Sequence, residues 1–150
     1  MILFKGSEIF SLDNKGRIGI PAKMYKSIPA EAENTFIVSR GLDQCINAYP
    51  RNIWIENVEP KYDFLDQHDP SHRIMLRQML EWHKEIIIDG YQKILIPKEY
   101  LDFAKIESKV KIIGVADHLE LWNPDIYDQY INSDPRSYEE IVRQVMTGSV

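Results

Sequence analysis

The sequence has few of the features that mark membrane, secreted or disulfide-bonded proteins. Its 150 residues contain one cysteine, Cys45, so no disulfide can form within the chain, which fits a reducing compartment. No apolar run approaches the roughly 20 residues that are needed to cross a bilayer. The N-terminus, Met1-Ile2-Leu3-Phe4-Lys5, lacks the basic segment and long apolar stretch of a secretion signal. We therefore expect a soluble, cytoplasmic protein with no membrane partner.

The chain also lacks the net positive charge that is common among nucleic-acid-binding proteins. Its formal net charge is −5, which taken alone argues against a polyanionic partner. The charge is unevenly distributed, however, because residues 1–30 hold five cations and two acids, whereas residues 31–150 hold 13 cations and 21 acids. A basic end on an acidic body can bind a polyanion when the acids point elsewhere. Taken alone, this charge distribution is more typical of ordinary variation over a protein surface than of a polyanion-binding site.

Motifs of the common enzyme classes are missing as well. We find no glycine-rich phosphate loop, serine nucleophile elbow or His-Glu metalloprotease motif. His68 and His72 have a spacing compatible with metal ligands, but Pro70 interrupts the helix that would align them. Cys45 could act as a nucleophile with His118, yet its apolar neighbours are typical of a small core residue. We expect no catalytic activity, cofactor, metal or small-molecule substrate.

The most informative feature that is present is an internal repeat. Residues 12–21, Leu-Asp-Asn-Lys-Gly-Arg-Ile-Gly-Ile-Pro, recur as residues 88–97, Ile-Asp-Gly-Tyr-Gln-Lys-Ile-Leu-Ile-Pro. Each copy reads apolar, Asp, three variable residues, a cation, Ile, any residue, Ile, Pro. Two further pairs of matching blocks follow in the same order, at residues 36–38 and 110–112 and at residues 46–49 and 119–122. Three ordered blocks indicate a duplication.

Each copy has the pattern of short strands followed by one small helix. Apolar positions that suit strands flank a turn at residues 13–16, where Gly16 can take a positive φ. A proline, Pro21 or Pro97, then ends the strand and suits the first turn of a helix. Each half is predicted to be a sheet of about four strands. Neither half has an adequate core alone, so the two halves either interdigitate or pack face to face.

Further helices are predicted around the copies. Typical helix starts occur at Pro50, Asp69-Pro70, Asn123-Pro124 and Ser137 with Glu140. A stripe at helical spacing, interpreted as core, is formed by Met75, Met79, Trp82 and Ile86. These patterns divide the chain into a first repeat, a linker with a helix, a second repeat and a C-terminal helical extension, at residues 7–54, 55–82, 83–126 and 127–150.

The repeated Asp-x-x-x-Arg/Lys hairpin, running into Ile-x-Ile-Pro and a short helix, resembles the SpoVT/AbrB-type DNA-binding element. Two such copies, together with residues 40–45, 49–50, 113–115 and 120–122, resemble the MraZ family of bacterial transcriptional regulators over roughly residues 1–130. The resemblance implies an α+β, β-rich fold, a pseudo-twofold double-split (swapped-hairpin) β-barrel with short flanking helices. It also implies a nucleoid-associated regulator that represses its own division and cell-wall gene cluster by binding repeated promoter boxes in double-stranded DNA as a ring homo-oligomer.

The family's Asp-x-x-x-Arg motif falls on Asp13 and Arg17, which makes the first hairpin the main candidate for DNA binding. Arg17 can offer a planar donor fork to phosphate or guanine, and Lys15 adds a charge nearby. Asp13 either holds the turn or orients Arg17 through a charge-assisted hydrogen bond. Lys5 and Lys23 are further candidates for phosphate contacts.

The second hairpin departs from this pattern. Asp89 is retained, but Lys93 stands at the arginine position, so the charge is kept while the bidentate fork is lost. This half either contacts the DNA backbone or serves as structural partner to the first.

The alternative function is an antitoxin-like or structural protein-interaction module, since the same β fold serves as the antidote half of toxin–antitoxin pairs. The acidic C-terminal region could bind a basic protein partner. The duplication favours the regulator, because an antitoxin usually carries one hairpin unit and dimerises. The DNA sequence recognised, repression against activation and the subunit number stay open.

Overall fold

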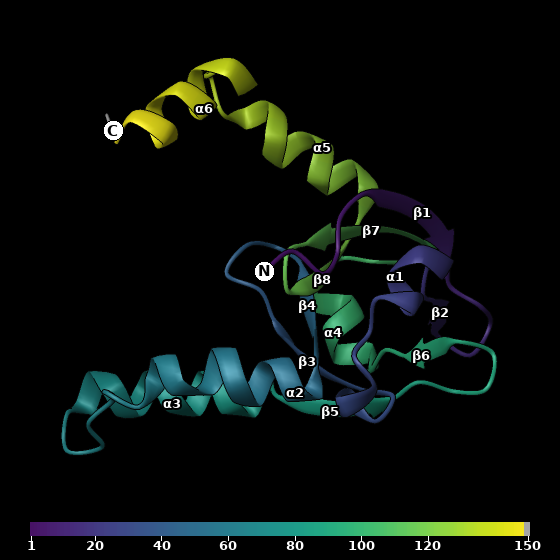
Figure 1. Cartoon of the computed structure of the whole chain (residues 1–150), viewed down its shortest axis with the longest axis horizontal. Coiled ribbons are helices and arrows are strands. Elements are labelled where there is room, and N and C mark those ends of the chain that lie inside the picture. Colours follow the sequence, from purple (N-terminus) through teal and green to yellow (C-terminus); the bar gives the residue numbers. More distant parts are fainter. Residues whose placement is uncertain (149–150) are drawn as a thin grey trace.

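Eight strands form two antiparallel sheets in the computed structural model, which describes residues 1–148 (Figure 1). The first repeat supplies β1 (Ser7–Ser11), β2 (Arg17–Gly19), β3 (Thr35–Arg40) and β4 (Ile46–Pro50). The second repeat supplies β5 (Lys84–Ile87), β6 (Lys93–Leu95), β7 (Lys109–Val115) and β8 (His118–Trp122). The α+β, strand-rich class is therefore confirmed.

The two repeats interdigitate in the larger sheet. Its strand order is β1-β7-β8-β4-β3-β5, so the first strand of each repeat pairs with the third strand of the other. The predicted closed barrel is not confirmed, because within residues 1–148 this sheet is open, with β1 and β5 at its edges. β2 and β6 form a separate ladder of three residue pairs, and the prolines that follow them, Pro21 and Pro97, have no N–H to extend it.

The strand registers follow the sequence repeat. In the β2–β6 ladder, Ile18 lies opposite Ile94, which is its own equivalent in the other copy. In the β4–β8 ladder, Asn47 lies opposite Glu120, again its own equivalent. An antiparallel ladder centred on two equivalent residues relates the repeats by a local twofold axis. The duplication inferred from the sequence is thus also present in the pairing of the strands.

The main core lies between the larger sheet and a layer made of β2, β6 and two short helices. Ile18 and Ile94 are each 1% exposed and pack with apolar residues of the larger sheet. The helices α1 (Ala22–Lys26) and α4 (Lys98–Phe103) follow β2 and β6 and add the buried side chains of Met24 and Tyr100. This layer holds the two Asp-x-x-x-cation turns in place.

Helices on the other side of the larger sheet extend from the body of the molecule (Figure 1). Trp54 and Val58, the first and last residues of the π-helical turn η2 (Trp54–Val58), pack on Ile37 of β3. The remaining helical segments are η1 (Ala30–Ala32), α2 (Arg51–Ile53), η3 (Glu59–Tyr62), α3 (Pro70–Glu81), α5 (Pro124–Ser133) and α6 (Tyr138–Thr147). In the described part of the chain, none of the helices combines the length and apolar character needed to cross a membrane.

Helices begin at all four predicted starts, and three of these starts have a side-chain cap, whereas α2 follows Pro50 without one. The side chains of Asp69, Asn123 and Ser137 accept hydrogen bonds from backbone N–H groups in the first turns of α3, α5 and α6. The C-terminal extension is helical over α5 and α6, and residues 149–150 lie outside the described residues.

The stripe predicted at helical spacing is core only at its C-terminal end, where Ile86 is buried and Trp82 packs against the core, and it is not one helix face. α3 ends at Glu81, because the chain then turns into β5 to pair with β3, and Ile86 lies on that strand. Met75 is 42% exposed and, with Met79, lines a cleft of about 610 Å³ between α3 and the sheet.

Candidate functional site

Asp13 builds the turn that precedes β2. Its Oδ1 accepts hydrogen bonds from the backbone N–H groups of Lys15 and Arg17, both at 2.9 Å. Gly16 supports the turn with a φ of 80°, as its position in the sequence predicts. One carboxylate oxygen is thus committed to the backbone, which leaves Oδ2 for other partners.

The second copy builds the same turn with different residues. Asp89 Oδ1 accepts from the backbone N–H groups of Tyr91 at 2.8 Å and Lys93 at 3.0 Å. Gln92 takes the place of Gly16, and its φ of 60° lies in the left-handed region without a glycine to relieve the strain. The two turns also brace one another, since Ile20 N donates to Gln92 O and Ile96 N donates to Gly16 O.

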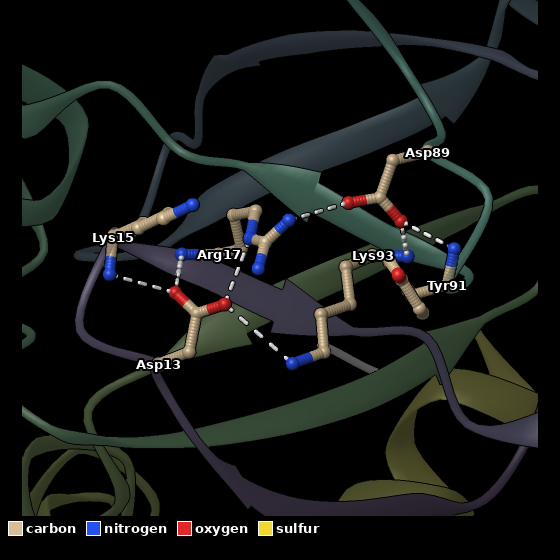
Figure 2. A network of polar contacts seen from close by, with 6 residues as sticks. All are labelled: Asp13, Lys15, Arg17, Asp89, Tyr91 and Lys93. Carbon is tan, nitrogen blue, oxygen red and sulfur yellow. Dashed lines mark hydrogen bonds and ion pairs between the residues drawn. The ribbon is translucent and has the colours of Figure 1, made fainter.

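The free carboxylate oxygens of the two turns join both repeats in one polar network (Figure 2). Arg17 Nε donates to Asp13 Oδ2 at 2.8 Å, and Arg17 Nη1 donates to Asp89 Oδ2 at 3.2 Å. Lys93 Nζ lies 3.5 Å from Asp13 Oδ2. Each cation therefore contacts the aspartate of the other copy, while Arg17 also contacts its own.

Hydrogen bonding keeps the acids of this network ionised. The pKa of Asp13 is held well below its ordinary value of 3.8, chiefly because the Arg17 backbone N–H donates to the carboxylate, although partial burial acts in the opposite direction. The pKa of Asp89 is also lowered, chiefly by the Lys93 backbone N–H. The pKa of Arg17 is raised, chiefly by its side-chain hydrogen bond to Asp13. The two acids and two cations cancel one another's charge, so the network is not simply a basic patch.

The other lysines proposed from the sequence lie outside the network. Lys15 contributes its backbone N–H to the Asp13 turn. Lys5 follows Phe4, which forms an isolated β-bridge with Ala116, and Lys23 lies on α1. All three side chains are exposed, and within residues 1–148 none of them forms an ion pair. They can supply mobile positive charge near a polyanion.

The residues considered for catalysis or metal binding have other partners. Cys45 is 1% exposed, and burial raises the pKa of its thiol, which disfavours the reactive thiolate. His118 Nδ1 lies 2.9 Å from Asp117 Oδ1, and His72 Nδ1 accepts from the Asp66 backbone N–H. Across the part of the chain that the structure describes, no three His, Cys, Asp or Glu side chains are arranged to hold a metal ion.

Sequence reasoning found the network residues but missed the contacts between copies. It treated the turns as separate sites, with Arg17 and Lys93 as independent donors. The available signal was the Ile-x-Ile segment after each turn, because pairing of these equivalent strands brings the turns together. The exposed Tyr91, 80% accessible at the second turn, was also not weighed as a contact residue.

Comparisons with known proteins agree with the duplication. The family model described as "MraZ protein, putative antitoxin-like" matches the chain twice, at residues 3–78 and 79–144. A protein named transcriptional regulator MraZ from Natranaerobius thermophilus is 33% identical over 144 residues, covering 96% of this chain and 97% of its own. A protein of the same name from Halothermothrix orenii is 34% identical, and the match covers 93% of this chain and 94% of that protein. A third protein of this name, from Phocaeicola vulgatus, is 33% identical, and the match covers 84% of this chain and 82% of that protein.

Proposed function

The chain belongs to the MraZ family, and from this premise we propose that it is a transcriptional regulator that binds double-stranded DNA in a sequence-specific way. The observation that carries the proposal is the meeting of two Asp-x-x-x-cation turns, one from each repeat, around the β2–β6 ladder (Figure 2). A rigid pair of exposed turns that presents an arginine and a lysine is suited to contact a DNA groove and its backbone. A regulator of this kind works in the cytoplasm, in association with the nucleoid.

The two turns have different roles in this proposal. A guanidinium has five N–H donors, and the carboxylates engage Arg17 through Nε and Nη1, so donors remain for a guanine edge or a phosphate. Lys93 has a single, flexible ammonium group and contacts phosphate. Lys15, Lys5 and Lys23 add phosphate contacts around them, which strengthen binding without reading the sequence.

The proposed target is a set of repeated boxes in the promoter of the chain's own division and cell-wall gene cluster, which the protein represses as a ring oligomer. The neutral network and the net charge of −5 imply weak binding by one subunit. Linking several subunits raises avidity by about 10² to 10⁴ without new contact types. Val145 and Met146 of α6 are 67% and 79% exposed, and such apolar side chains suit burial against a neighbouring subunit.

The decisive experiment compares two duplexes of equal length, the DNA upstream of the protein's own gene and a scrambled version. Binding is measured at two stated salt concentrations, because phosphate contacts alone weaken steeply with salt. A regulator keeps a preference for the upstream duplex at both concentrations. Equal affinity for the two duplexes would overturn the proposal and favour the protein-interaction module.

A further inference from the structure

Within the network, Arg17 contacts two carboxylates, one from each turn, whereas Lys93 contacts one. Asp13 contacts Nε at 2.8 Å, and Asp89, from the other repeat, contacts Nη1 at 3.2 Å. A guanidinium is planar, so contacts at two of its nitrogens define the orientation of the whole plane. Asp13 alone fixes one point, and Asp89 supplies the second.

Asp89 is itself held rigidly. Its Oδ1 accepts from the backbone N–H groups of Tyr91 and Lys93, which leaves Oδ2 directed at Arg17 (Figure 2). An acceptor that is fixed by the backbone does not lose further side-chain freedom when it holds its partner. Such preorganisation lowers the entropy that must be lost when a donor engages a ligand.

We propose that Asp89 is a positioning residue that orients Arg17 for base reading, so that sequence recognition by the first repeat depends on a carboxylate from the second. This inference rests on the proposed DNA-binding function. It assigns the second repeat a part in specificity, although its own cation, Lys93, lacks the bidentate fork.

A purely electrostatic role for Asp89 leads to a different expectation. Removing a negative charge beside a DNA-binding surface raises the affinity for every duplex, whatever its sequence. Loss of orientation instead lowers the preference for the upstream duplex over the scrambled one, even if overall affinity rises. The ratio of the two affinities therefore separates positioning from charge.

The test uses Asp89→Asn in the full-length protein. The asparagine side-chain oxygen can still accept the two backbone hydrogen bonds of the turn, but it has lost the charge that holds Arg17. The matched control is Asp102→Asn, which removes an equal charge from an ion pair on α4, where Asp102 lies 3.2 Å from Lys98. Thermal unfolding of both variants checks that the fold is intact.

We expect Asp89→Asn to lower the upstream-to-scrambled affinity ratio by about fivefold or more, and Asp102→Asn to leave it unchanged. In an Arg17→Ala background, Asp89→Asn should lower the ratio no further, because no guanidinium is left to orient. A ratio unchanged by Asp89→Asn, while the wild type prefers the upstream duplex, would overturn this inference alone. A wild type without any preference would overturn both proposals.

A measurement without DNA provides a second readout. In the free wild-type protein, the hydrogen bond to Asp89 should slow rotation about the Arg17 Nε–Cζ bond, so that the Nη1 and Nη2 resonances are resolved by NMR. In Asp89→Asn they should average, while in Asp102→Asn they stay resolved. Averaged resonances in the wild type would contradict the proposed orientation of Arg17.

Discussion

Arg17 and Lys93 are equivalent residues of the two repeats, but they differ in the number of carboxylates that they contact. Arg17 has two carboxylate partners, whereas Lys93 has one at 3.5 Å. If Arg17 reads bases, Arg17→Ala should lower the preference for the upstream duplex roughly 5- to 150-fold per engaged site. Lys93→Ala should instead weaken binding to both duplexes by similar factors and make the salt dependence shallower. Salt titrations of each variant on both duplexes measure the two effects.

The opposite result would reverse these roles. Loss of preference in Lys93→Ala, together with its retention in Arg17→Ala, would mean that the second repeat reads the bases. Neither substitution should shift the thermal unfolding midpoint much, since both side chains are partly exposed and such ion pairs contribute little to folding.

Asp13 gives a prediction on pH. Because the pKa of Asp13 is lower in the folded protein than its ordinary value of 3.8, its charge stabilises the fold above about pH 4 and loses this effect as the pH falls further. Asp13→Asn should therefore be less stable than the wild type at pH 6, and the difference should shrink steadily below pH 4. Urea unfolding of both proteins between pH 6 and pH 2.5 measures it. A difference that is constant across this range would contradict the prediction.

At the scale of the elements, the β2–β6 ladder joins the two repeats through a single buried pair of isoleucine side chains. Ile18 and Ile94 lie opposite one another and are each 1% exposed. Ile94→Ala should lower the free energy of unfolding by about 2–5 kcal/mol, the usual cost of truncating a buried isoleucine. Both repeats contribute to one core, so unfolding should remain a single transition.

The control for this substitution is an exposed isoleucine on β5, the strand that precedes β6 in the chain. Ile87 on β5 is 73% exposed, so Ile87→Ala should change stability by no more than about 0.5 kcal/mol. Urea unfolding compares the two variants. A second transition in Ile94→Ala would show that the repeats fold independently and would contradict the interdigitated core.

At the scale of the whole molecule, α6 determines how copies associate under our proposal. Light scattering should give the wild type a mass several times its subunit mass of 17.6 kDa. Val145→Glu introduces a charge on the exposed apolar face of α6 and should lower that mass, because burying an unpaired charge is costly. Binding to the upstream duplex should weaken with it, as avidity is lost.

The matched variant is Thr147→Glu, which adds the same charge to the last turn of the same helix but on its polar side. We expect it to keep the wild-type mass. A wild-type monomer that still binds the upstream duplex tightly would exclude the ring, and equal effects of the two substitutions would exclude the apolar face of α6 as the contact.

Much of the local structure could be predicted from particular residues. The Asp13 turn with its positive φ at Gly16, the strands that end at Pro21 and Pro97, and the capped starts of α3, α5 and α6 all depend on neighbours a few residues apart. Such features are encoded by backbone geometry and short-range hydrogen bonds. Helical spacing in the sequence continues through Ile86, but α3 ends at Glu81, because strand pairing with β3 decides where the helix ends.

The sequence by itself determined the duplication, the family and the residues of the candidate site, because these are carried by residue identity and spacing. Only the tertiary structure decided that the two halves interdigitate in an open sheet and that Arg17 lies between Asp13 and Asp89. Asp89 is 72 positions from Arg17 in the chain, and no local pattern states that their side chains meet. That contact follows from the pairing of β2 with β6, which burial of Ile18 against Ile94 stabilises.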